Sequence, residues 1–86
     1  MVYISLSIHI QDVLTRQITR SSVSLYCDTN PTIASLIEYD PDVYRPHYLY
    51  YKCSTEDKAV PGAHLPLSTP IFNNNTIFIH KFEASN

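Results

Sequence analysis

The sequence predicts one α+β domain in which a mixed sheet of four to five strands packs on a single short helix, in the order strand, strand, helix, strand, strand. Three observations support this prediction. Residues 2–11 alternate between apolar and polar side chains without a break, residues 76–82 alternate again, and residues 33–37 carry apolar side chains at helical spacing. A chain of 86 residues suffices for one hydrophobic core, so we place a single domain at 1–83 and a short tail at 84–86.

The first two strands are expected to pair as an antiparallel hairpin. A second alternating run at 22–27 follows the first strand after a polar stretch and is typical of its partner. Ile18 lies at an odd distance from Val23 and would face the opposite side of a regular strand, so we expect a bulge near Ser21 and Ser22. The first strand would direct Val2, Ile4, Leu6, Ile8 and Ile10 to one face and Tyr3, Ser5, Ser7, His9 and Gln11 to the other.

The helix and the remaining strands follow from turn and cap residues. Either Asn30 or Thr32 can cap the helix, and Asp40, which precedes a proline, ends it after little more than two turns. The Tyr and Leu residues of 47–53 favour a third strand. Three consecutive asparagines at 73–75 mark the turn before the last strand.

Charge and hydropathy exclude several classes of partner. The formal charge of −2 gives no general attraction to polyanions, so we expect no nucleic acid as partner. No stretch approaches the roughly 18 apolar residues of a membrane helix, and no secretion signal opens the chain. We therefore expect a protein inside the cell, in the cytoplasm or nucleus, with Cys27 and Cys53 as buried reduced thiols rather than a disulfide.

The sequence gives no sign of a catalytic or metal centre. Neither cysteine has a histidine at a recognisable motif spacing, and core packing explains both thiols. His47, Cys53 and His64 lie around a loop at 54–66, which allows at most a short edge strand, but their spacing fits no structural zinc pattern. The single glycine, Gly62, excludes a glycine-rich phosphate loop. We expect no enzyme activity, no cofactor and no metal.

Several spacings resemble ubiquitin and its relatives. The run Val23-x-Leu25-x-Cys27 is followed, at the distance seen in ubiquitin, by a Thr-Ile pair at 32–33 that opens the helix. Near the end of the chain, Leu67-Ser68, Ile71 and the run at 76–79 are similar to ubiquitin's Leu-Ser turn, buried isoleucine and last strand. The resemblance covers nearly the whole chain and implies the ubiquitin-like β-grasp fold. The first hairpin looks longer than ubiquitin's, and the helix looks shorter.

The C-terminus departs from the pattern of the conjugated members of that family. Those modifiers end in an exposed Gly-Gly, whereas this sequence ends in Lys-Phe-Glu-Ala-Ser-Asn at 81–86. The expected function is therefore a non-catalytic protein-protein interaction module, or a small subunit of a larger complex, with another protein as partner. Two alternatives stay open. One is an accessory β-grasp subunit of a multicomponent enzyme, and the other is a ubiquitin-like modifier without its processed tail.

The open face of the sheet is the predicted binding surface. If the isoleucines of the last strand face the helix, Phe78 and His80 lie on the open face, and the same argument places Tyr48 and Tyr50 there. His9 of the first strand extends this aromatic, weakly charged patch, whose composition is typical of interface cores. Ubiquitin's binding patch implies the same surface, because Tyr50 and His80 match its two strand positions. Leu14 is the residue nearest to its hairpin-tip leucine.

Overall fold

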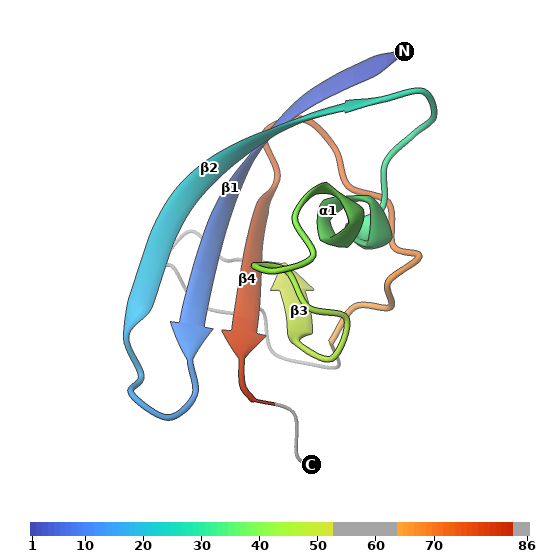
Figure 1. Cartoon of the computed structure of the whole chain (residues 1–86). Coiled ribbons are helices and arrows are strands. Elements are labelled where there is room, and N and C mark those ends of the chain that lie inside the picture. The colour runs from blue at the N-terminus through green and yellow to red at the C-terminus, as the bar shows by residue number, and fades with distance from the viewer. Residues whose placement is uncertain (53–63, 84–86) are drawn as a thin grey trace.

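The computed structural model describes residues 1–52 and 64–83 and confirms the predicted α+β class, with a mixed four-stranded sheet and one short helix. The elements follow the predicted order along the chain (Figure 1). They are β1 (Val2–Asp12), β2 (Ile18–Cys27), α1 (Ile33–Tyr39), β3 (Leu49–Lys52) and β4 (Thr76–Lys81).

The strands lie in the order β2-β1-β4-β3 across the sheet. β1 pairs antiparallel with β2 and parallel with β4, and β3 pairs antiparallel with β4. The first and last strands of the described chain are therefore the two central strands. Figure 1 shows the helix on one face of this twisted sheet, which we call the inner face; the opposite face is the outer face.

The predicted hairpin is confirmed, but the predicted bulge is wrong. Pairing between β1 and β2 runs without interruption from Val2 opposite Cys27 to Gln11 opposite Ile18. Ile18 is only half-buried beside Gln11 on the outer face, so it has no need to turn inward. β2 is consequently a long and regular strand.

The asparagine turn fastens β4 to β1. The Ser5 N–H donates to Asn73 Oδ1 at 2.8 Å, and the Asn74 N–H donates to the Ser5 carbonyl at 2.8 Å. The Ser7 N–H then donates to the Asn75 carbonyl at 3.0 Å. Asn74 has a φ of 69°, a left-handed conformation that asparagine tolerates better than most residues. The turn thus sets the register in which the two central strands pair.

Thr32, one of the two predicted caps, is the N-cap of α1. Its N–H donates to Ser35 Oγ at 3.0 Å, as in a capping box. Ile33 and Leu36 are completely buried against the sheet, and Ile37 packs against the same core, which confirms the predicted apolar stripe. The helix ends after Tyr39, as the following Asp-Pro pair predicts.

Residues 65–71 connect the start of the helix to the sheet. The Ile33 N–H donates to the Thr69 carbonyl at 3.2 Å, and the Ala34 N–H donates to the Leu67 carbonyl at 3.0 Å. In return, the Ile71 N–H donates to the Pro31 carbonyl at 3.1 Å, and Ile71 is buried. These bonds satisfy backbone donors at the helix N-terminus that have no partner within the helix.

The predicted orientation of the third strand is wrong, and the strand begins two residues later than predicted. β3 covers only Leu49–Lys52, and Cys53 lies outside the described residues. Tyr50 stands opposite Ile79, so both side chains share the inner face, and Tyr50 is 1% exposed. Tyr48 is also a core residue, at 7% exposed. Neither tyrosine lies on the open face, because the register with β4 directs Tyr50 inward and both rings belong to the buried core.

The buried tyrosine keeps its hydroxyl group hydrogen-bonded. Tyr50 Oη donates to the Arg45 carbonyl at 2.8 Å, so the ring is buried without leaving a polar atom unpaired. The core, defined by contact among buried side chains, consists of Ile4, Leu6, Ile8, Val23, Leu25, Ile33, Leu36, Tyr44, Tyr48, Tyr50, Ile71, Ile77 and Ile79.

We expect Tyr50→Ala to lower the free energy of unfolding by about 3–5 kcal/mol, because it removes a buried ring and leaves a cavity. Tyr50→Phe keeps the ring and loses one hydrogen bond, at a cost of about 1 kcal/mol. Urea unfolding followed by circular dichroism measures both values. Tyr39→Ala is the control, since that ring is 57% exposed and its loss should change stability by less than about 0.5 kcal/mol. A Tyr50→Ala variant as stable as this control would contradict the inward orientation.

The tyrosine core should also make the fold sensitive to alkaline pH. Burial raises the pKa of Tyr50 well above its usual range, with Tyr48 and Tyr44 acting in the same direction, and burial raises the pKa of Tyr44. The unfolded chain releases these protons near pH ~10 while the folded chain retains them, so stability is complete below about pH 10 and falls above it. The urea midpoint should decline in this range. The decline should be smaller in Tyr50→Phe, and an equal decline would contradict the assignment.

Candidate protein-binding surface

The registers of the four strands define which side chains share the outer face. His9 stands beside Phe78 in the parallel pair, and Phe78 stands opposite Tyr51 in the antiparallel pair. The outer face therefore combines serines in its middle with rings towards its two ends. Its side chains are Ile18, Arg20, Ser22, Ser24 and Tyr26 from β2, Tyr3, Ser5, Ser7, His9 and Gln11 from β1, Thr76, Phe78 and His80 from β4, and Leu49 and Tyr51 from β3.

One end of the outer face carries a cluster of rings around His80. Its imidazole meets Tyr51 at 4.9 Å and Phe78 at 5.3 Å between ring centres, both edge-to-face. Phe78 is only 3% exposed and His9 only 9%, whereas His80 and Tyr51 are half-buried. The structure thus places Phe78, His80 and His9 on the predicted face, but at this end of the face His80 and Tyr51 provide the accessible rings. Tyr51 takes the place that the sequence reasoning gave to Tyr50.

The other end carries two exposed tyrosines that the sequence reasoning missed. Tyr3 and Tyr26 are directly paired across β1 and β2, and their rings meet edge-to-face with centres 5.4 Å apart. They remain 57% and 70% exposed. Tyr3 Oη donates to Ser24 Oγ at 3.2 Å. The hydroxyl groups of Ser24 and then Ser5 can donate to the phenolate, which lowers the pKa of Tyr3. The alternation that identified the first strand already assigns Tyr3 to this face, so the signal was available.

Tyr48 belongs to a separate ring cluster that holds the end of β4 near the start of β3. The His47 ring lies 4.8 Å from that of Tyr48 and 5.5 Å from that of Phe82. His47 Nε2 also lies 3.0 Å from the Phe82 carbonyl oxygen, within hydrogen-bonding distance. His47 and Tyr48 thus make contacts that stabilise the fold. Tyr48 lies in the core and not on the predicted binding surface.

Leu14 is at the tip of the first hairpin, as predicted, and is 81% exposed. Asp12 shapes this tip, because its Oδ1 accepts the N–H groups of Leu14 at 2.8 Å and Thr15 at 3.2 Å. Arg16 adopts a left-handed φ of 64°, and its N–H donates to the Asp12 carbonyl at 2.7 Å. Leu14 is therefore held in a defined loop at the far end of the hairpin from the tyrosine pair.

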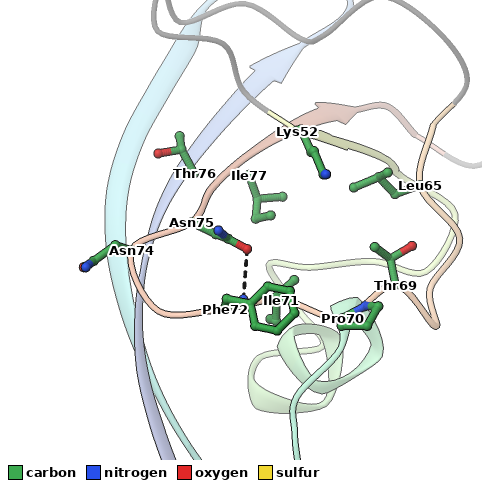
Figure 2. Close-up of a pocket in the computed structure, with 10 residues that line it drawn as sticks. All are labelled: Lys52, Leu65, Thr69, Pro70, Ile71, Phe72, Asn74, Asn75, Thr76 and Ile77. Carbon is green, nitrogen blue, oxygen red and sulfur yellow. Dashed lines mark hydrogen bonds between the residues drawn. The ribbon is translucent and has the colours of Figure 1, made fainter.

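A groove of about 500 Å³ lies beside the start of β4. Figure 2 shows Lys52 and Leu65 on one side of it and Pro70 and Phe72 on the other, with the Phe72 N–H donating to Asn75 Oδ1 at 2.9 Å. The lining residues are Lys52, Leu65, Thr69, Pro70, Ile71, Phe72, Asn74, Asn75, Thr76 and Ile77. None of these ten residues is a histidine, cysteine or carboxylate, so they supply no general acid–base pair.

Comparisons with known proteins return no relatives. No family model matches the chain, and neither the curated proteins nor the solved structures contain a match.

The described part of the chain brings together no cluster of metal-ligating side chains. Within 1–52 and 64–83, no group of three or more histidine, cysteine, aspartate or glutamate side chains is placed to hold a metal ion. Cys27 is a free thiol at the end of β2, half-buried. No helix in this part of the chain has the length and apolar character needed to cross a membrane.

We expect Asp12→Ala to lower the free energy of unfolding by about 1 kcal/mol, because it leaves two backbone N–H groups of the hairpin tip without their acceptor. Asp12→Asn retains an oxygen at the same position and should restore most of the loss. Urea unfolding gives the stability, and amide hydrogen exchange at Leu14 reports on the loop directly. Equal exchange rates in the two variants would show that the carboxylate does not organise the tip.

Proposed function

We propose that the chain is a non-catalytic protein-binding domain of the ubiquitin-like β-grasp kind, which docks its partner on the outer face of the sheet. The fold assignment is supported by the central parallel pair β1–β4 and by a helix packed on one face only. It is also supported by the Leu67-Ser68 turn and the buried Ile71, two features on which the ubiquitin resemblance rests.

The exposed Tyr3–Tyr26 pair is the observation that carries this proposal. Rigid aromatic side chains are favoured interface anchors, because they contribute a large contact area and lose little conformational entropy on binding. These two rings stand on paired strand positions, so their separation is fixed by the sheet. A partner that covers them buries apolar ring faces while the hydroxyl groups remain available for hydrogen bonds.

The rest of the outer face complements the tyrosine pair. Ser5, Ser7, Ser22 and Ser24 form a polar strip between the two ring clusters. Arg20 is the only Lys, Arg, Asp or Glu among the outer-face side chains of the four strands. Depletion of charge together with aromatic residues distinguishes interface cores from ordinary surface. The Tyr51–His80 rings at the other end provide a second contact area for the same partner.

The proposal is tested by affinity capture from an extract of the native cells. The baits are the wild-type domain, the Tyr3→Ala/Tyr26→Ala variant and the control Tyr39→Ala, which removes an exposed tyrosine from α1. We expect proteins that are retained by the wild type and the control but lost from the double variant. Titration calorimetry with the purified partner should then show at least a tenfold loss of affinity, which corresponds to about 1.4 kcal/mol.

A partner list that the double variant shares with the wild type would refute docking at the tyrosine pair. Circular dichroism of each bait separates loss of binding from loss of folding, because both tyrosines are exposed and their replacement should leave the fold intact. A Tyr51→Ala/His80→Ala bait examines the other end of the face. Loss of the same partner from this bait would show that one protein spans the whole outer face.

A further inference from the structure

The outer edge of β2 has no pairing strand among the described residues. β2 is the first strand in the sheet order, and its ten residues are about twice the usual length of a strand. Proteins normally protect such an edge with prolines, bulges or several charged residues. β2 contains no proline, pairs in unbroken register with β1, and has Arg20 as its one charged residue.

The hydrogen-bond pattern shows which backbone groups point to this edge. The Asp12 N–H donates to the Gln17 carbonyl at 3.0 Å, so the alternate residues of β2 from Thr19 to Cys27 exchange bonds with β1. Consistently, the Ser7 N–H of β1 is directed to β4 instead. The remaining residues of β2 therefore direct their backbone N–H and C=O groups outward. They include Ser22, Ser24 and Tyr26, all exposed.

We propose that this edge pairs antiparallel with β2 of a second copy of the chain, with Ser24 opposite Ser24 of the second copy. The two sheets then form one continuous eight-stranded sheet about a twofold axis. Ser24 exchanges backbone hydrogen bonds with its counterpart, and Ser22 exchanges them with Tyr26 of the second copy. This inference does not depend on the proposed docking function.

This register is selected by the side chains. Arg20, an exposed residue of β2, then stands opposite Asp28, the exposed residue that directly follows β2 in the second copy, and by symmetry the same additional ion pair forms on the other side of the axis. The register also places Val23 opposite Leu25 of the second copy, so that apolar side chains meet on the inner face. Shifting the pairing to centre it on Val23 or on Ser22 places Arg20 opposite Tyr26 or Ser24 and removes the ion pair. The net charge of −2 on each copy opposes association only weakly.

A groove beside the same edge gives room for the incoming strand. It has a volume of about 440 Å³ and lies between the end of β2 and α1, where Leu25, Cys27 and Tyr39 contribute to its wall. In the proposed register the inner-face side chains next to this groove are Val23 and Ser21 of the second copy, which are small. Figure 1 shows β2 as the outermost strand, with α1 on the inner face towards β4 and β3.

The test is a pair of cysteine variants in a Cys27→Ser/Cys53→Ser background. In the proposed register the Cα atoms of residue 24 in the two copies lie about 5.5 Å apart, within the range that a disulfide spans. Residue 22 is displaced from its counterpart by about 13 Å along the strands and is the matched control. Mild oxidation should convert Ser24→Cys to a covalent dimer and leave Ser22→Cys largely monomeric. Preferential cross-linking of Ser22→Cys, or equal cross-linking of both variants, would overturn the register.

Sedimentation of the cysteine-free protein measures the association without a cross-link. The dimer fraction should rise with protein concentration, and a monomer at every concentration would overturn the proposal. Ser24→Pro removes an N–H that is directed to the edge and is not used by β1, so we expect a folded monomer. Persistence of the dimer in that variant would also overturn the proposal. Circular dichroism verifies that the Ser24→Pro variant is folded. Binding of this variant to an outer-face partner is measured separately, so that a failure of the dimer proposal can be distinguished from a failure of the docking proposal.

Discussion

The parallel pairing of β1 with β4 is the constraint on which the rest of the structure depends. It joins segments 68 residues apart in the chain, and the hydrogen bond from Ser5 to Asn73 holds them in register. Without it, the β1–β2 hairpin and the β4–β3 pair would share no strand contact, because the sheet order places this junction between them. The apolar rows of both halves then form one core, which α1 covers with Ile33 and Leu36.

A helix of seven residues covers little of a four-stranded sheet, and the tyrosines compensate for this. Tyr44, Tyr48 and Tyr50 fill the inner face with rings, and the hydroxyl of Tyr50 reaches the backbone of the preceding loop. The same residue type serves the outer face differently, because Tyr3 and Tyr26 present their rings to solvent. One chemical group therefore provides both the volume that completes the core and the surface proposed to recognise a partner.

The sequence predicted most reliably where a pattern is long and unambiguous. The alternation of β1 and the asparagine turn were read correctly, because ten residues of one period fix a face. β3 has only four residues, and its amphipathic tyrosines fit either face, so its orientation is decided by Ile79 on the neighbouring strand. The bulge predicted from Ile18 is wrong for a related reason. An apolar residue at the edge of a sheet can stay half-buried, so Ile18 does not have to face the core. Of the residues predicted for the open face, Phe78, His80 and His9 lie on the outer face, whereas Tyr48 and Tyr50 do not.

The strand order also imposes an order of events during folding. β1 and β2 are joined by a short loop and can pair as soon as both have been synthesised, whereas β3 has no neighbour in the sheet except β4. Because closing a long loop is entropically costly, contacts of such high contact order form late. On the ribosome, β3 must therefore wait for β4 to emerge. Until then, Ile8 and Ile10 of β1 lack the strand that pairs with them, and apolar side chains exposed in this way during synthesis favour aggregation.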